Sequence, residues 1–305
     1  MHMTMPERKT LFGFGPGTAV GEVSEILRCA ARADRDGLDL FTISDHPYYG
    51  GRLDAYATLG FVLGRTSALT GVANVTNLPS RPAPMLARTV TSLSALSGGR
   101  VVLGLGAGGY WDEIVRLGVP RLGPAAAVRA MEEAVILVRA LSGGGGPVTF
   151  DGEFHQVSGI DPAPVPAPPI WLGSVGPKSL AVTGRLADGW IPGRAADWLS
   201  SRYRESRPAI DDAAAAAGRD PAEIATIYNL PGRITPSPLP ATRDRAGRWV
   251  GGSAGQWAEE LTAAVLEHGA SGFVYFVADD TPSEVALGRW AQEVVPAVRE
   301  AVAGA

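Results

Sequence analysis

The feature that most constrains the fold is an alternation of short apolar runs with longer amphipathic segments along the chain. Eight apolar runs have the length and composition of buried strands, and a helical pattern follows each of them. Consecutive strands joined through helices run parallel, because a parallel pair needs a long crossover connection. Eight such units within 305 residues predict one α/β domain over residues 1–305, a closed (β/α)8 or TIM barrel.

The pattern also predicts the element boundaries. Strands are expected at Thr10–Gly15, Leu38–Ser44, Thr70–Val75, Arg100–Gly106, Pro169–Ser174, Gly189–Pro192, Ile224–Leu230 and Gly272–Val277. Helices are expected at Gly21–Asp36, Ala55–Ala68, Pro82–Leu96, Pro124–Leu141, Pro177–Leu186, Ala196–Ala217, Gly255–His268 and Pro282–Val302.

Two segments interrupt the repeat and are expected to form insertions at the C-terminal mouth of the barrel. Residues 143–168 contain Asp151-Gly152 between short alternating runs, which predicts a hairpin followed by a proline-rich stretch. Residues 231–248 are rich in proline, arginine and threonine and predict a mobile loop over the mouth.

Composition excludes several classes of protein. The net charge is −4 and no long cluster of lysine and arginine occurs, which argues against nucleic-acid or polybasic membrane binding. The single cysteine, Cys29, excludes an intrachain disulfide and a cysteine-based metal site. No run approaches the roughly 20 apolar residues of a membrane span, and the first residues lack a signal-peptide pattern. We therefore expect a soluble, cytoplasmic protein.

The pair Asp45-His46 stands where the second expected strand ends, just before Pro47. Strand ends at the mouth of such a barrel are where catalytic residues usually lie. A metal site is not expected, because the four histidines are scattered and no His-x-x-x-His pair occurs. No G-x-S-x-G motif offers a nucleophile for His46 to activate. A purely structural histidine remains the alternative to a catalytic one.

Glycine-rich turns follow two other strands. Gly104, Gly106 and Gly109 fit G-x-G-x-x-G only weakly, and close approach of the backbone to a flat ligand ring is the alternative. The turn before Pro177 opens a helix whose free amides would bind an anion, with Arg194 as a second phosphate partner. An ordinary strand–helix connection is equally compatible with this turn.

Polar and aromatic residues complete the expected mouth. Asn74 and Asn77 could hydrogen-bond a heterocycle, although Asn77 before Pro79 also suits a plain turn. Tyr48, Tyr110 and Trp111 could line an aromatic substrate pocket, or could simply pack the loops against the barrel.

Together these segments resemble the luciferase-like monooxygenase superfamily of flavin and deazaflavin enzymes. The resemblance covers nearly the whole chain, and the order and spacing of its motifs are specific. The matching motifs are Ser44-Asp45-His46, 71–77 with Arg81-Pro82, 97–108, 150–154, 169–173, 187–190, and 269–273 leading to 293–296.

The resemblance implies a flavin-type ring across the strand ends, and the Asp-His pair is similar to that of enzymes using the deazaflavin coenzyme F420. It implies that His46 sits beside the reactive carbon of the ring, with Asp45 positioning it or tuning its pKa. It also implies a homodimer and a non-proline cis peptide at Asn74–Val75. The residues expected to bind the ring and phosphate are Asn74, Val75, Thr76, Gly106, Ala107, Gly108, Gly173, Ser174, Val175, Gly176 and Arg194.

One departure narrows the expected substrate. Deazaflavin-linked sugar-phosphate dehydrogenases carry a glutamate directly after the Gly-x-Gly loop, where this chain has Gly109. That difference argues against a sugar-phosphate substrate and leaves the proton donor unassigned. The expected activity is hydride transfer between F420 and a small organic molecule. The alternatives are an FMN-dependent monooxygenase that takes reduced flavin from a partner reductase, and a flavin-binding barrel without catalysis.

Overall fold

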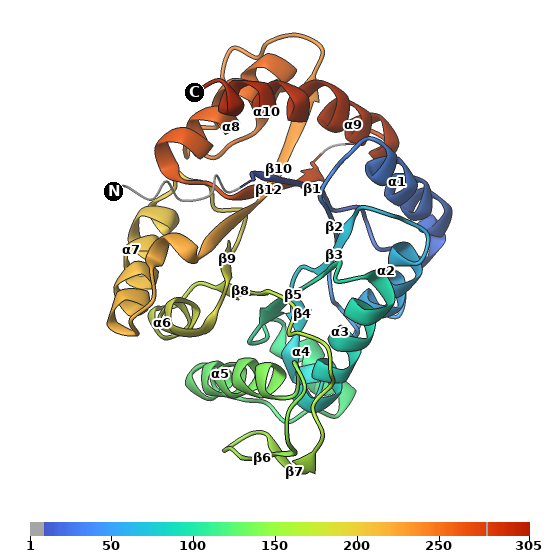
Figure 1. Cartoon of the computed structure of the whole chain (residues 1–305). Helices are drawn as coiled ribbons and strands as arrows, with labels where there is room; N and C mark the ends of the chain where they lie inside the picture. The colour runs from blue at the N-terminus through green and yellow to red at the C-terminus, as the bar shows by residue number, and fades with distance from the viewer. Residues whose placement is uncertain (1–8, 279) are drawn as a thin grey trace.

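The computed structural model describes residues 9–278 and 280–305. Parallel strands form a closed central barrel, and helices surround it (Figure 1). The strands of the barrel wall are β1 Leu11–Phe14, β2 Leu40–Ile43, β3 Thr70–Ala73, β5 Val101–Gly106, β8 Ile170–Ser174, β9 Gly189–Pro192, β10 Ala225–Thr235 and β12 Gly272–Val277. Two short strands, β4 Thr76–Asn77 and β11 Gly251–Ser253, extend the wall at β5 and β10.

The helices alternate with the strands as the sequence predicts. They are α1 Val23–Arg35, α2 Ala55–Leu63, α3 Ala83–Ser97, α4 Trp111–Ile114, α5 Pro124–Ala140, α6 Pro177–Leu186, α7 Ser201–Ala216, α8 Ala254–His268, α9 Ser283–Arg289 and α10 Val295–Ala303. Among the described residues, none of these helices is long and apolar enough to cross a membrane.

The barrel closes because β10 pairs with strands on both of its sides. The order runs β12, β1, β2, β3, β5, β8, β9 and β10, and β10 pairs in parallel with β12 again. This closed arrangement confirms the predicted (β/α)8 barrel. Its C-terminal end gathers the connections that follow each strand, which is where ligands bind in barrels of this type.

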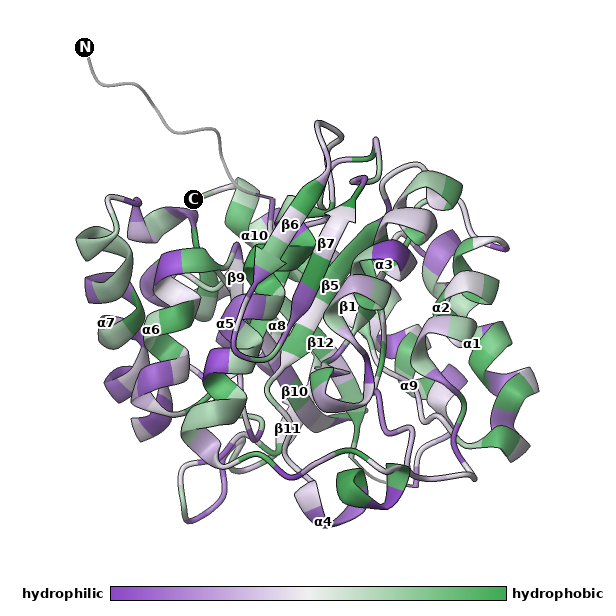
Figure 2. Ribbon diagram, turned by 90° about the horizontal axis from the view of Figure 1, so that it is seen from below, coloured by the Kyte–Doolittle hydropathy of each residue, from purple (hydrophilic) through white to green (hydrophobic). Residues whose placement is uncertain are grey.

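Alternating strand residues divide the core into two layers. In β2, Leu40 belongs to the cluster inside the barrel, whereas Phe41 packs against the surrounding helices. β12 repeats the pattern, with Val274 inside and Phe273 outside. Residues of one strand point alternately to opposite faces, and a strand buried on both faces is therefore apolar throughout. Figure 2 shows the hydrophobic colours along the barrel strands and hydrophilic residues on outer helices such as α7.

Capping residues explain where helices differ from the predicted bounds. α7 begins after Ser200, five residues later than expected at Ala196, because the Ser200 hydroxyl accepts a hydrogen bond from the Tyr203 amide. α2 ends at Leu63, with Gly64 as its C-cap, rather than at Ala68. The predicted last helix is divided into α9 and α10 by a π-helical turn at Trp290–Val294.

The predicted hairpin in residues 143–168 is confirmed as β6 Val148–Asp151 and β7 Gln156–Ile160. Its turn is longer than Asp151-Gly152, because the Gly152 amide donates to the His155 carbonyl and Phe154 lies in the loop. Glu133 of α5 accepts hydrogen bonds from the amides of Glu153, Phe154 and His155 at 2.8–3.1 Å. The hairpin follows α5 along the chain, and Figure 1 shows that it lies outside that helix.

The segment 231–248 differs from the predicted loop in two ways. Its first five residues continue strand β10 to Thr235, and the remainder is tied to α8 by paired side chains. Gln256 accepts from the Leu239 amide and donates to the Leu239 carbonyl, both at 2.9 Å. Arg243 pairs with buried Asp197 at 2.8 Å and also with Glu260. The mobility of this segment stays a prediction.

Candidate functional site at the barrel mouth

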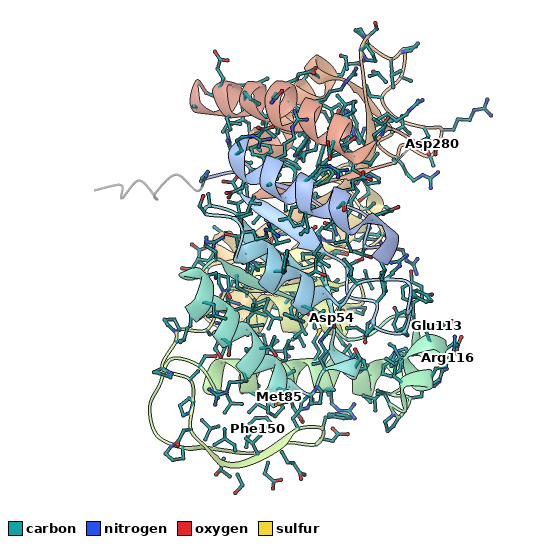
Figure 3. All side chains as sticks on the ribbon, turned by 90° about the vertical axis from the view of Figure 1, so that its right-hand side faces the viewer. Asp54, Met85, Glu113, Arg116, Phe150 and Asp280 are labelled. Carbon is teal, nitrogen blue, oxygen red and sulfur yellow. The ribbon has the colours of Figure 1, made fainter. Side chains whose placement is uncertain are left out.

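The predicted site residues follow the C-terminal ends of the strands and lie on one side of the barrel. Figure 3 shows Asp54, Glu113 and Asp280, from the connections after β2, β5 and β12, on this side of the molecule. The connection after β2 carries the titratable pair, and that after β5 carries the glycine-rich run. The titratable pair and the glycine-rich run that the sequence singles out therefore both lie at the mouth.

His46 lies half-buried at the end of β2, in contact with tyrosine side chains. Its Nδ1 atom lies 2.7 Å from the hydroxyl oxygen of Tyr48. The ring of Tyr110 meets the imidazole edge-on, with ring centroids 5.6 Å apart. Nε2 has no hydrogen-bond partner among the described residues. It is thus the ring nitrogen that remains available to a ligand.

The surroundings of His46 favour the neutral imidazole. Burial lowers its pKa below the ordinary 6.5, and the positive charge of Arg52 lowers the pKa further. The Asp45 carboxylate raises the pKa of His46 and only partly offsets those two effects. Asp45 therefore tunes His46 weakly, and neutral His46 prevails at neutral pH.

Asp45 makes its hydrogen bonds to Arg81 and Asn77 and not to its sequence neighbour His46. Asp45 is buried, and its carboxylate accepts from Arg81 Nη2 at 2.6 Å and Nε at 2.7 Å, and from the Asn77 amide at 2.9 Å. Within the described part of the chain it makes no hydrogen bond to His46. The positioning contact expected from Asp45 is made by Tyr48 instead, and a catalytic role for Asp45 stays a prediction.

Arg81 joins two acidic residues into what we call the acid–arginine cluster, formed by Asp45, Asp54 and Arg81. Arg81 Nη2 also binds Asp54 at 2.6 Å, and its guanidinium lies 4.8 Å from the ring centre of Tyr56. Burial alone would lower the pKa of Arg81, but the bonds to Asp45 and Asp54 outweigh it and raise the pKa. The cluster ties the connection after β2 to the segment after β4.

Val75 forms an apolar projection at the mouth. The peptide bond Asn74–Val75 is cis, which confirms the expected bond. A Cβ atom on Gly106 would lie 2.8 Å from Val75, and one on Gly173 would lie 3.1 Å away. These two glycines leave room for the Val75 side chain. The space that the sequence suggested for a ligand ring is thus occupied by Val75 itself, and a ring would lie against Val75.

The polar side-chain atoms of several predicted cofactor ligands are hydrogen-bonded to other groups of the protein. Asn74 exchanges two amide hydrogen bonds with Asn229 of β10, at 2.8 and 3.2 Å. The Thr76 hydroxyl lies 2.6 Å from the buried Tyr56 hydroxyl. The side chain of Thr76 therefore points away from the mouth, and only its backbone could meet a cofactor.

At the turn after β8, too, a side-chain hydroxyl is hydrogen-bonded within the protein. The Ser174 hydroxyl is buried and lies 2.7 Å from the Thr183 hydroxyl of α6. The Gly176 amide donates to the Ser179 hydroxyl at 3.2 Å. Val175 is exposed, and Gly173 faces Val75. An anion at this turn would rely on the remaining backbone amides at the start of α6 rather than on the hydroxyl of Ser174.

Arg194 faces a different part of the mouth than the turn after β8. It lines a cavity of about 400 Å³ that contains none of Gly173, Ser174, Val175 or Gly176. We call this the arginine cavity, because Arg194, Arg233 and Arg248 line it over an apolar wall that includes Trp249 and Leu230. Arg248 pairs with Asp244, whereas the side chains of Arg194 and Arg233 have no acidic partner among the described residues.

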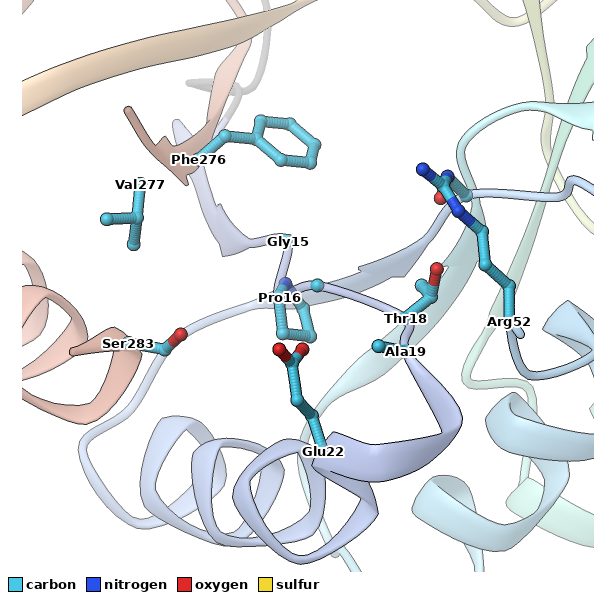
Figure 4. A pocket seen from close by; sticks show the side chains of 11 residues that line it. Gly15, Pro16, Thr18, Ala19, Glu22, Arg52, Phe276, Val277 and Ser283 are labelled. Atoms are coloured by element: carbon cyan, nitrogen blue, oxygen red, sulfur yellow. The ribbon is translucent and has the colours of Figure 1, made fainter. Parts of the chain in front are cut away.

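A second cavity of about 390 Å³ opens beside β1, β2 and β12. Arg52 lies on the opposite side of it from Val277 and Ser283 (Figure 4). Ser44, next to Asp45 in the chain, also lines it. Arg52, which lowers the pKa of His46, therefore faces this cavity.

The aromatic residues predicted to line one pocket are separated. Tyr48 and Tyr110 both contact His46. Trp111 instead lines a cavity of about 280 Å³ with Ala107, Pro79 and the hairpin residue Phe154. Gly108 has φ +96°, and a Cβ there would lie 2.7 Å from Pro79. The structure thus brings Tyr48 and Tyr110 to His46 and leaves Trp111 beneath the glycine loop.

Sequence reasoning assigned no role to Arg52, Arg81, Asn229 or Arg233. Arg81 was visible as the Arg81-Pro82 pair after β4, but its partner Asp45 is 36 residues away in sequence. No grouping of three or more potential metal ligands occurs within the described residues.

Comparison with known proteins places this geometry in a family. The model for luciferase-like monooxygenase matches residues 9–286. A 5,10-methylenetetrahydromethanopterin reductase of Methanolobus tindarius is 31% identical over 206 residues, which cover 66% of this chain and 59% of that protein. An F420-dependent glucose-6-phosphate dehydrogenase of Microbacterium testaceum is 30% identical over 237 residues, covering 75% of this chain and 68% of that protein.

A solved structure shares the whole fold. The coenzyme F420-dependent tetrahydromethanopterin reductase of Methanopyrus kandleri superposes with a TM-score of 0.77 at 18% identity, over 94% of this chain and 99% of that one. The likeness agrees with the closed barrel, and the family model covers most of the chain. The chain therefore belongs to the luciferase-like monooxygenase family.

Proposed function

We propose that this protein is an F420-dependent oxidoreductase that transfers a hydride between the deazaflavin and a small organic substrate. The observation that carries the proposal is His46, whose Nε2 atom at the barrel mouth has no partner among the described residues, in a chain whose relatives are named as F420-dependent enzymes. Neutral His46 can donate or accept a proton next to a bound ring.

The mouth fits a flat, anionic cofactor. Val75 offers an apolar contact for a ring, supported from below by Gly106 and Gly173. The arginine cavity holds two cations without acidic partners in the described chain, Arg194 and Arg233, which suits a negatively charged tail. The amides at the start of α6 offer a further place for a phosphate.

When bound, the deazaflavin supplies a hydride and is a poor partner for oxygen, which favours a reductase or dehydrogenase over an oxygenase. The protein's own part is to hold the substrate and manage its proton. His46 takes that part at Nε2, and Tyr110 borders the imidazole at the mouth.

The substrate proposed here is a small, mostly apolar molecule. Tyr48 and Tyr110 give the surroundings of His46 an aromatic character. Gly109 is exposed and carries no acid next to the glycine loop, which argues against a sugar phosphate. A carbonyl compound or its alcohol would suit a single histidine as the proton-handling group.

Side-by-side fluorescence titration with F420 and with FMN tests the proposal. We expect saturable micromolar binding of F420 and much weaker binding of FMN. Saturation by FMN alone would replace the proposal with a flavin monooxygenase that depends on a partner reductase. Tight F420 binding without any change in ring absorbance, across a panel of ketones, aldehydes and alcohols, would favour a barrel that only binds the cofactor.

A further inference from the structure

We propose that Tyr48 fixes His46 in the tautomer that carries its proton on Nε2, and that Tyr48 supplies the proton which replaces it during reduction of a carbonyl substrate. The inference deepens the proposed function and rests on it for the identity of the reaction. It assigns Tyr48 as a positioning and proton-relay residue that acts through His46, which is the proton donor to the substrate.

The contact itself is short and enclosed. The Tyr48 hydroxyl oxygen lies 2.7 Å from His46 Nδ1. Both residues are half-buried, and the rings of Tyr49 and Tyr110 pack within 6.2 Å of them, centre to centre. A hydrogen bond held between packed aromatic rings restricts how the imidazole can rotate.

The direction of this hydrogen bond follows from the acceptors within reach of the phenol proton. A hydroxyl has one proton to donate and lone pairs to accept with. Burial raises the pKa of Tyr48 to about 12, so the phenol keeps its proton at neutral pH. Among the described residues, the structure gives the Tyr48 hydroxyl one acceptor for its proton, His46 Nδ1 at 2.7 Å. Tyr48 therefore donates its proton to His46 Nδ1.

This direction decides which nitrogen of His46 bears the proton. A neutral imidazole that accepts at Nδ1 carries its hydrogen on Nε2. Nε2 has no partner within the described residues, so its N–H is free to meet a substrate oxygen. The charges that act on the ring are those of Asp45 and Arg52, and their effects on its pKa oppose each other.

The proton transfer balances without any further acid. The carbonyl carbon gains the hydride pair supplied by the cofactor, the carbon–oxygen π bond breaks, and the oxygen takes the proton from Nε2. Nδ1 takes the Tyr48 proton at the same time, so His46 remains neutral with its hydrogen now on Nδ1. The resulting phenolate regains a proton from water. An alkoxide is a stronger base than a phenolate, so the transfer runs downhill.

Tyr49 provides a matched control within the same loop. Its ring lies 6.1 Å from that of His46, centre to centre, and 4.7 Å from that of Tyr48. Its hydroxyl makes no hydrogen bond to His46 among the described residues. Tyr49→Phe therefore removes the same atom as Tyr48→Phe from a neighbouring position without touching the proposed relay.

The test is NMR of the ring nitrogens in the cofactor-free protein labelled with 15N-histidine. Long-range proton–nitrogen spectra distinguish the two neutral tautomers, and His46→Asn identifies the signals of His46 among those of four histidines. We expect the Nε2–H pattern in the wild type. In Tyr48→Phe we expect a mixture of tautomers and a higher His46 pKa, because the neutral form loses its donor at Nδ1. Tyr49→Phe should match the wild type.

Four results would overturn the inference: an Nδ1–H pattern in the wild type, an unchanged tautomer in Tyr48→Phe, a lowered His46 pKa in that variant, or the same change in Tyr49→Phe. Because these spectra need no cofactor, they are independent of whether F420 binds. With reduced F420 and cyclohexanone or benzaldehyde, Tyr48→Phe should lower turnover about 10- to 100-fold at unchanged F420 affinity. Turnover within twofold of the wild type would contradict proton delivery by Tyr48.

Discussion

The two sides of the barrel mouth use their charges differently. Beside β2 and β4, the acid–arginine cluster pairs every charge, and the carboxylate of Asp45 is 1% exposed. Beside β9 and β10, Arg194 and Arg233 face the arginine cavity, and the structure gives neither side chain an acidic partner within the described residues. The cluster satisfies its own charges, although Arg52 on the same side has no acidic partner among the described residues, and the second side leaves Arg194 and Arg233 open to solvent.

The difference separates architecture from binding. The charges of this cluster are paired with one another, with Asp45 buried and Asp54 exposed, so its effect is to hold the connection that carries His46. Cations without partners over an apolar wall have bonding capacity left for a ligand, and they attract an anion from solution. We therefore assign stability to the first side and cofactor affinity to the second.

The largest expected effect is a loss of stability when Arg81 is removed from the acid–arginine cluster. Arg81→Met leaves the Asp45 carboxylate buried without its cation, and we expect the free energy of unfolding to fall by about 3–5 kcal/mol. Urea denaturation followed by circular dichroism measures this. Adding Asp45→Asn to Arg81→Met removes the stranded charge and should recover part of the loss. A loss below about 1 kcal/mol would mean that the pair does not hold this side together.

Next in size is the effect of His46 on turnover. His46→Asn removes the group that moves the proton, so we expect turnover to fall about 10²- to 10⁴-fold. The F420 dissociation constant should stay close to that of the wild type, because the cofactor affinity is assigned to the other side of the mouth. Steady-state kinetics and fluorescence titration measure the two quantities. Equal losses in both would make His46 a binding residue.

A smaller effect is expected from the unpaired side. Replacing both Arg194 and Arg233 with methionine should weaken F420 binding about 10- to 100-fold, the range of one or two lost charged hydrogen bonds. The remaining affinity should depend less on salt than in the wild type. Unfolding free energy should change little, because exposed, unpaired side chains contribute little to stability.

Arg245→Met is the control for that experiment. Arg245 is exposed in the same segment, does not line the arginine cavity, and carries the same charge. An equal loss of F420 affinity in this control would show a general effect of net charge instead of a site. That result would contradict the assignment of cofactor affinity to the side of the mouth that holds the arginine cavity.

The smallest effect is a pH dependence of stability from His46. Its pKa is lower in the folded protein than the ordinary 6.5, chiefly because of burial. Its neutral form therefore stabilises the fold fully above pH 6.5, and the contribution is lost as the pH falls through the folded pKa. The stability difference between the wild type and His46→Asn should be flat above pH 7 and shrink below 6.5. A difference that grows as the pH falls would contradict the sign.

The fold was predictable because its signals are local. Buried strands such as β2 and β12 are continuous apolar runs, and prolines mark helix starts such as Pro124 and Pro177. The boundaries that differ depend on single side chains. Ser200 ends the irregular stretch before α7 by capping it, and alanine-rich composition alone extends the predicted helix too far toward its N-terminus.

The contacts of the site were less predictable because neighbours in an extended segment face opposite ways. Asp45 and His46 adjoin in sequence, yet Asp45 points to Arg81 and His46 to Tyr48. The same alternation places the hydroxyl of Ser174 against α6 while Gly173 faces Val75. The position of each residue along the chain was enough to predict which residues lie at the mouth. The direction of each side chain could be seen only in the structure.

The most direct test of this account is one F420 titration carried out on three proteins: the wild type, His46→Asn and the Arg194→Met/Arg233→Met double variant. The account predicts equal dissociation constants for the wild type and His46→Asn, with binding at least tenfold weaker in the arginine double variant. Equal binding by all three proteins, or a loss confined to His46→Asn, would contradict the assignment of cofactor affinity to the arginine cavity.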